Sequence, residues 1–231
     1  MPKISRRNLL IGGTAIAGVA ALMSKPDDKS GPRDPYFLSI QQALMNAGIA
    51  TPTLVIDRAR LNANIDALKR HLPEGMGYRI VAKSLPSISL IQHVAQRANT
   101  DRLMTFNLPM LVALSALMPE ASQLVGKPLP VQAARLYFER LPPTRIEAAD
   151  HIQWLIDTPN RLTQYQELAR SLNRTLRLNL ELDVGLHRGG FETGADLDAV
   201  LKEIKTDPNL EFAGFMGYEP HIPSLPTTLG W

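Results

Sequence analysis

The sequence predicts an α/β protein whose parallel strands form an incomplete (β/α)8-type barrel. Short apolar runs, many of them β-branched, alternate with segments of helical periodicity between residues 36 and 218, and seven such runs can be distinguished. Strands that alternate with helices favour a parallel sheet, and a barrel is the closed form of such a sheet. An eighth strand is missing, because residues 222–231 carry three Pro or Gly residues and are typical of a loop.

The expected elements can be placed in order. Strands are expected at residues 51–57, 80–82, 102–106, 123–125, 152–157, 176–183 and 212–218. Helices are expected at residues 36–47, 58–70, 87–97, 109–118, 131–141, 159–171 and 195–205. Gly48 ends the first helix, Asp57 can cap the second, and Asp157 or Thr158 can cap the helix that begins with Pro159. A barrel domain is therefore expected over residues 36–231.

The first 23 residues have the pattern of a twin-arginine signal segment. Arg6 and Arg7 follow a serine and precede two leucines, and an uncharged run extends from Leu9 to Met23. This run has 15 residues, fewer than the roughly 20 that a relaxed membrane span needs. We expect export to the periplasm by the twin-arginine machinery, or anchoring in the membrane by an uncleaved segment. Residues 24–35 are a polar, proline-rich linker.

Composition narrows the possible functions. With 231 residues, 45% of them apolar, the chain is long enough for one sizeable core or two small ones. It has no cysteine, which excludes disulfides, thiolate zinc sites and cysteine nucleophiles. The formal charge of +3 arises in the first 34 residues, which hold six Lys or Arg against three Asp. The remainder is balanced, which argues against a nucleic-acid partner.

Lys83 is the first candidate functional residue. It follows the apolar run Ile80 to Ala82, and Pro86 ends the strand shortly afterwards. The next helix begins at Ser87, so Lys83 is expected at a β-to-α junction, on the face where parallel sheets bind ligands. Burial and apolar neighbours lower the pKa of an ammonium group, which frees the amine to form a Schiff base with an aldehyde. A solvated lysine at a strand end is the alternative.

Two further strand ends carry candidate residues. Residues 181–191 form an acidic strand end followed by glycines on both sides of His187 and Arg188, so that a guanidinium group and the backbone can approach an anionic ligand. Residues 214–221 end the seventh strand with Tyr218, whose phenol can stack on a flat cofactor or hydrogen-bond to it. An exposed arginine and a packing tyrosine are the alternatives. His187 is interpreted as a surface or hydrogen-bonded histidine, and no metal ligands are assigned. His93 and His151 lack metal-ligand spacing, and no role is assigned to them or to His71.

Taken together, these strand ends resemble the fold type III pyridoxal-phosphate enzymes. The resemblance is to the D-threonine aldolase and D-serine dehydratase-like group, which is related to alanine racemase through the alanine racemase N-terminal domain. It covers about residues 50–221, with order and spacing kept. The segments that carry it are residues 51–57 with Leu61 and Asn64, the strand with Lys83, and residues 106–110, 126–128, 183–190 and 214–221.

The resemblance implies a barrel that holds pyridoxal 5'-phosphate as an aldimine on Lys83. Arg188 matches the family arginine near the phenolic oxygen of the cofactor, and Tyr218 falls in a segment that lines its ring. The implied activity is that of a lyase on a D-3-hydroxy amino acid, by retro-aldol cleavage or by α-proton loss with elimination of the hydroxyl group. A homodimer is also implied.

The resemblance does not extend to the whole family pattern. The phosphate cradle, the partner of the pyridine nitrogen and the C-terminal β domain with its metal ligands lie later in the chain of these enzymes, and the sequence offers no counterpart. We therefore expect a fragment of a longer protein or a truncated relative, and a divalent metal only in a full-length relative. Two other functions remain open: a non-catalytic pyridoxal-phosphate carrier, and a racemase, which requires a second acid/base residue.

Overall fold

The structure is a computed structural model that describes residues 31–85 and 87–222. The chain divides into two compact units, residues 1–56 and residues 57–231. The first unit contains helix α2 (Pro35–Asn46), whose N-terminus is capped by Asp34: its carboxylate accepts a hydrogen bond of 2.8 Å from the Tyr36 N–H. This confirms the first predicted helix. The predicted export signal, residues 1–23, and most of the linker lie outside the described residues.

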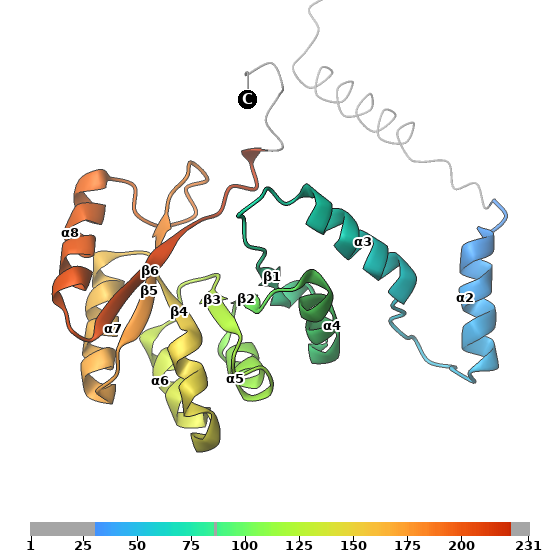
Figure 1. Cartoon of the computed structure of the whole chain (residues 1–231), viewed down its shortest axis with the longest axis horizontal. Helices are drawn as coiled ribbons and strands as arrows, with labels where there is room; N and C mark the ends of the chain where they lie inside the picture. Colours follow the sequence, from blue (N-terminus) through green and yellow to red (C-terminus); the bar gives the residue numbers. More distant parts are fainter. Residues whose placement is uncertain (1–30, 86, 223–231) are drawn as a thin grey trace, which may run out of the picture. The chain divides into compact units, whose positions relative to one another are not determined.

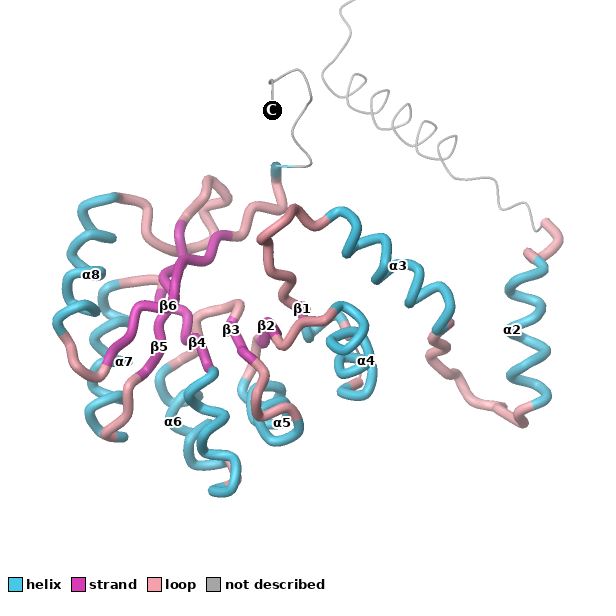
Figure 2. Tube along the Cα trace, viewed as in Figure 1, coloured by secondary structure: helices cyan, strands magenta, loops and turns pink. Residues whose placement is uncertain are grey.

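The second unit holds one parallel sheet of six strands, arranged in chain order from β1 to β6 (Figure 1). The strands are β1 (Ile80–Val81), β2 (Arg102–Thr105), β3 (Ser122–Val125), β4 (Ile152–Ile156), β5 (Leu176–Leu182) and β6 (Leu210–Gly217). The helices are α3 (Arg58–His71), α4 (Ile88–Ala98), α5 (Leu108–Leu117), α6 (Val131–Arg140), α7 (Pro159–Leu172) and α8 (Gly194–Thr206). Figure 2 shows α4 to α8 along one side of the sheet. The predicted α/β class with an incomplete barrel is confirmed.

Two short 3-10 segments were not predicted. Ala82–Ser84 forms one turn directly after β1, and Pro143–His151 connects α6 to β4. The first of these shortens the predicted lysine strand to two residues, so Lys83 lies in a turn and not on a strand. None of the described helices is long and apolar enough to cross a membrane.

The first predicted strand, residues 51–57, is absent. Residues 52–57 belong to no strand, and the sheet begins at Ile80. Three of these residues expose large apolar side chains, with 71% of Leu54, 43% of Val55 and 44% of Ile56 accessible. Their β-branched composition suits a strand, but a strand also requires a neighbour for its backbone groups. No ladder partner for this segment occurs in the part of the chain that the structure describes.

Helix termini follow the capping residues in the sequence. The Asp57 carboxylate accepts from the N–H groups of Ala59 and Arg60 at the start of α3. Of the two candidates for α7, the cap is Thr158, whose hydroxyl accepts from the Arg161 N–H at 3.1 Å. At their other ends, α4 and α7 terminate at Asn99 and Asn173, both in the left-handed region that asparagine tolerates better than most residues.

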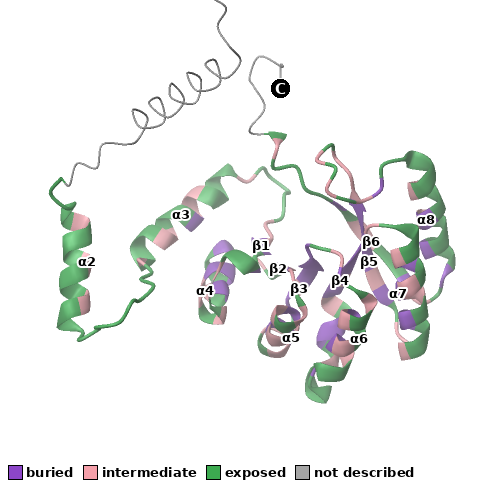
Figure 3. Cartoon of the chain, turned by 180° about the vertical axis from the view of Figure 1, so that it is seen from behind, coloured by how far each residue is buried: buried purple, intermediate pink, exposed green. Residues whose placement is uncertain are grey.

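The main core lies between the sheet and the helices. Figure 3 shows buried residues on the strands and on the helix faces turned toward them, with exposed residues on the outer helix faces. At its centre, Trp154 of β4 is fully buried, and its ring centroid lies 5.6 Å from that of Tyr137 and 5.7 Å from that of Tyr165. Burial raises the pKa of the Tyr137 phenol to about 12, so this ring stays neutral.

The opposite face of the sheet is partly polar. Because strand side chains alternate between faces, the neighbours of Trp154 point away from the helices. There, Gln153 donates to the Ser122 hydroxyl at 3.3 Å, and Asn179 donates to the Gln153 side-chain oxygen at 2.9 Å. Glu181 is two residues beyond Asn179 on β5 and shares its face. This polar face would line the interior of a closed barrel.

Candidate functional site

The predicted site residues lie at the carboxyl ends of the strands. Lys83 follows β1, Arg188 is in the loop after β5, and Tyr218 directly follows β6. All six strands are parallel, so these three residues lie at the same end of the sheet. This is the end at which α/β sheets and barrels bind their ligands.

Lys83 is exposed and stands beside an aromatic ring. Its Nζ lies 4.2 Å from the ring centroid of Phe106, the residue that follows β2. The burial expected for this amine from the sequence is not found, because Lys83 is exposed. No carboxylate of the described residues forms a salt bridge with Lys83, so its amine can reach an aldehyde.

Gly126 makes room for the Phe106 ring. A Cβ atom at this position, just after β3, would lie 2.7 Å from Cε1 of Phe106 and 2.8 Å from Cγ of Met104. A side chain here would therefore push Phe106 away from its place beside Lys83. This assigns a packing reason to one of the segments that carry the family resemblance, residues 126–128.

The loop after β5 is organised by Asp183. Its carboxylate accepts from the N–H groups of Gly185 at 2.9 Å and His187 at 3.0 Å, and Nδ1 of His187 lies 2.9 Å from its second oxygen. The hydrogen bond from the His187 N–H outweighs burial and, with that from Gly185, holds the pKa of Asp183 below its usual value. His187 has a φ of 53°, in the left-handed region, so the chain turns directly before Arg188.

Arg188 contacts the side chains of Glu181 and Tyr218. Its Nη2 donates to Oε1 of Glu181, and its guanidinium carbon lies 4.4 Å from the centroid of the Tyr218 ring. The Glu181 side chain is only 4% exposed, whereas that of Arg188 is 23% exposed. The structure thus brings two of the three predicted residues together, through a cation–π contact.

Glu181 has no role in the sequence-based prediction. The available signal is its position on β5, where it shares the inward face with Asn179 and precedes Arg188 by seven residues. This position indicates a contact with Arg188 only if the loop after β5 is known to fold back onto the end of the strand. In the structure the loop does so, because the Phe191 N–H donates to the Glu181 carbonyl oxygen at 2.8 Å.

Lys83 and Arg188 belong to opposite edges of the sheet. Lys83 and Phe106 follow β1 and β2, whereas Glu181, Arg188 and Tyr218 belong to β5, β6 and the loop between them. No interaction in the described part of the chain joins the two groups. The site therefore consists of two halves, which would face each other across the interior if the sheet closed further.

The loop also gathers three possible metal ligands. One ligand atom each from Asp183, His187 and Glu192 lies within 4.8 Å of the other two. Both carboxylate oxygens of Asp183 are already engaged by Gly185 and His187. These hydrogen bonds explain why Asp183 and His187 lie close together.

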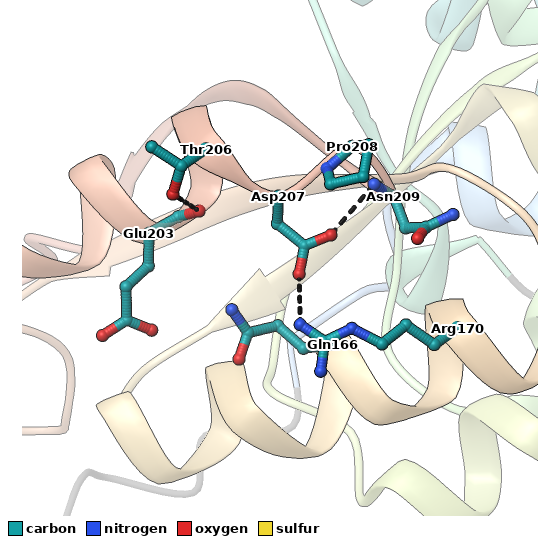
Figure 4. A pocket seen from close by; sticks show the side chains of 7 residues that line it. All are labelled: Gln166, Arg170, Glu203, Thr206, Asp207, Pro208 and Asn209. Atoms are coloured by element: carbon teal, nitrogen blue, oxygen red, sulfur yellow. Dashed lines mark hydrogen bonds and ion pairs between the residues drawn. The ribbon is translucent and has the colours of Figure 1, made fainter.

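Two cavities lie away from Arg188. A cavity of about 300 Å³ between α7 and α8 is lined mainly by polar side chains, and Asp207 bridges Arg170 and the Asn209 N–H there (Figure 4). It lies at the amino ends of the strands, the face of a barrel that usually serves stability and not ligand binding. A larger cavity of about 400 Å³ borders β1 and is lined in part by Val81, the last residue of β1, and by Ser84, which follows Lys83 in the turn.

We expect Gly190→Ala to disrupt the Arg188 loop. Gly190 has a φ of 104°, and a Cβ there would lie 2.6 Å from the Glu181 carbonyl oxygen and 2.9 Å from the Asp183 nitrogen. Backbone strain and this clash together should lower the free energy of unfolding by about 1–3 kcal/mol. Urea denaturation followed by circular dichroism measures the loss.

Gly194→Ala is the matched control. This glycine lies four residues further on, a Cβ added to it would meet no atom within 4 Å, and it does not have a positive φ. Because alanine favours helices, the variant should be as stable as the wild type or slightly more stable. Equal stability of the two variants would contradict the close packing of Gly190.

Comparisons with known proteins place the fold. The family model for the alanine racemase N-terminal domain matches residues 56–228. Alanine racemase from E. faecalis is 16% identical, with a TM-score of 0.62 over 75% of this chain and 45% of that chain. D-threonine aldolase from Filomicrobium marinum is 16% identical, with a TM-score of 0.59 over 73% of this chain and 44% of that chain.

A third solved structure widens the range of activities on this fold. Histidine racemase from Leuconostoc mesenteroides subsp. sake is 20% identical, with a TM-score of 0.53 over 68% of this chain and 40% of that chain. The chain thus spans less than half the length of these solved structures, and none of the curated proteins matches it. Since the family model matches most of the chain, the protein belongs to the alanine racemase N-terminal domain family of fold type III pyridoxal-phosphate enzymes.

Proposed function

We propose that this protein binds pyridoxal 5'-phosphate through Lys83 and, with it, acts as a lyase on D-3-hydroxy amino acids. The observation that carries the proposal is the position of the Lys83 amine. It is exposed, forms no salt bridge with the described residues, and lies at the carboxyl end of the sheet that the family model matches. The narrower assignment to a lyase rests on the resemblance of residues 183–190 and 214–221 to the D-threonine aldolase group. A D-threonine aldolase is also among the solved structures with this fold.

The side chains at the two sheet edges suit this cofactor in kind. A primary amine at Lys83 is the group that condenses with an aldehyde. Nη2 of Arg188 is engaged by Glu181, but its Nε and Nη1 donate to no protein atom in the described residues, which leaves N–H groups for a phenolic oxygen. The ring of Tyr218, 48% exposed, offers a face against which a pyridine ring can pack.

Each side chain then has a defined task. Pyridoxal phosphate supplies an electron sink when bound. Lys83 holds it in place through Nζ, and Phe106 confines the lysine side chain from one side. Arg188 donates hydrogen bonds, and its fixed positive charge at neutral pH stabilises negative charge on an oxygen beside it.

Product analysis tests the lyase. Aldol cleavage of D-threonine yields glycine and acetaldehyde, whereas elimination yields 2-oxobutanoate and ammonia. Incubation of the cofactor-loaded protein with D-threonine should produce one of these pairs, and L-threonine should produce neither. Interconversion of D- and L-alanine without either pair would instead establish a racemase.

A pyridoxal-phosphate carrier without catalytic activity is the second candidate. Lys83 is exposed at one edge of an open sheet, whereas catalytic sites usually exclude water, and this difference favours the carrier. The lyase and the carrier differ in their effect on D-threonine. The carrier would bind the cofactor through Lys83 and release it to another protein, but would leave D-threonine unchanged.

We further propose export by the twin-arginine route, as the pattern of residues 5–10 suggests. The variant in which Arg6 and Arg7 are both replaced by lysine should stay in the cytoplasm, because this route reads the arginine pair and not merely positive charge. Cell fractionation with an antibody against the folded domain measures the distribution. Replacing Lys3 by arginine is the control, and export of the double-lysine variant at the wild-type level would contradict the proposal.

A further inference from the structure

Glu181 is a buried carboxylate for which the proposed function has no use. Its side chain is 4% exposed, and it lies on the inward face of β5, close to the carboxyl end of the strand. A carboxylate is seldom buried unless it is paired, because removal from water is costly. Its partner is Arg188, through a charge-assisted hydrogen bond from Nη2 to Oε1.

A second contact holds the same guanidinium group. Its central carbon lies 4.4 Å from the centroid of the Tyr218 ring. The carboxylate holds one end of the guanidinium group, and the ring restricts the group to one side. An arginine side chain has several rotatable bonds, and each contact removes part of its rotamer freedom before a ligand arrives.

The remaining N–H groups of Arg188 are left for a ligand. Among the described residues, only Glu181 accepts a hydrogen bond from this guanidinium group, which carries five N–H donors. A second arginine, Arg177 on the same strand, also pairs with a glutamate, Glu211, at 3.0 Å. That pair is more exposed, at 32% and 52%, and lies at the amino ends of β5 and β6, away from the candidate site.

We infer that Glu181 is a positioning residue, which fixes the Arg188 guanidinium group so that its free N–H groups meet the phenolic oxygen of pyridoxal phosphate. The inference rests on the proposed function for its ligand. The contact between Glu181 and Arg188 belongs to the cofactor-free protein, so its effect on Arg188 can be measured separately. Glu181→Gln tests it, because glutamine keeps the size of the side chain and removes its charge.

The first measurement needs no cofactor. Phenylglyoxal modifies accessible, unpaired arginines, and mass spectrometry reports the rate at each position. In the cofactor-free full chain, Glu181→Gln should accelerate modification of Arg188 several-fold, whereas Glu211→Gln should leave the rate at Arg188 unchanged. An unchanged rate at Arg188 in folded Glu181→Gln, with native circular dichroism, would overturn the inference.

The second measurement is a double-mutant cycle on cofactor affinity. Glu181→Gln should raise the dissociation constant for pyridoxal phosphate roughly tenfold, the lower end of the effect known for removing the outer partners of metal ligands. In an Arg188→Met background the same change should have less than about a twofold effect, since the two residues act as one unit. An equal loss in both backgrounds would overturn the inference.

The two measurements separate failure of the inference from failure of the proposed function. If the wild type binds no pyridoxal phosphate, or binds it equally well after Lys83→Ala, the proposed function fails while the modification rates still decide whether Glu181 holds Arg188. If cofactor binding depends on Lys83 but neither rate nor affinity responds to Glu181→Gln, only the inference fails.

Discussion

Replacing Lys83 with alanine is expected to abolish covalent retention of pyridoxal phosphate. In the structure, Lys83 offers an exposed amine at the carboxyl end of the sheet, beside the Phe106 ring. Alanine has no nitrogen for the linkage, so the loss should be complete and not partial. After incubation with the cofactor and reduction with borohydride, absorbance of the desalted protein measures what is retained.

Lys127→Ala is the matched control for this variant. Lys127 is also exposed and follows β3 at the same end of the sheet, so it samples the same surface without lying in the turn after β1. This variant should retain as much cofactor as the wild type. If instead both variants lost half of the label, pyridoxal phosphate would be reacting with surface lysines in general, and a specific site at Lys83 would be excluded.

Trp154→Ala should cause the largest loss of stability. Trp154 is fully buried and packs between Tyr137 of α6 and Tyr165 of α7. Truncation of a buried tryptophan leaves a large cavity and typically costs about 3–5 kcal/mol, a large share of the stability of a domain of this size. Urea denaturation measures the change in the free energy of unfolding.

Trp154→Phe separates packing from hydrogen bonding at the same position. The Nε1 atom of Trp154 is buried and has no hydrogen-bond partner among the described residues. Phenylalanine removes this unsatisfied group while keeping most of the aromatic contacts, so it should cost far less than alanine does. A loss as large as that of Trp154→Ala would contradict this expectation.

Most of the secondary structure follows from local sequence signals. Apolar runs predicted six of the seven expected strands correctly, because their neighbours in the sheet also exist. The segment at residues 51–57 has a similar composition and is not a strand, since composition cannot supply a partner. The turn at Ala82–Ser84 shows the same limit: it begins where β1, a strand at one edge of the sheet, stops pairing with β2.

The candidate site was predictable in its parts but not in its arrangement. Lys83, Arg188 and Tyr218 could be picked out because each follows a strand, and parallel strands end together. The role of Glu181 depends on the fold of the loop after β5, which Asp183 organises through backbone hydrogen bonds. Such a contact within a glycine-rich loop has no periodic signature in the sequence.

Peptide mapping of the reduced protein tests the central claim most directly. The wild-type chain is incubated with pyridoxal phosphate, treated with borohydride, digested and analysed by tandem mass spectrometry. We expect a single phosphopyridoxyl group on the Nζ atom of Lys83 in most molecules, at cofactor concentrations near that of the protein. A label spread over several lysines, or one that spares Lys83, would contradict the assignment of this residue as the cofactor-binding lysine.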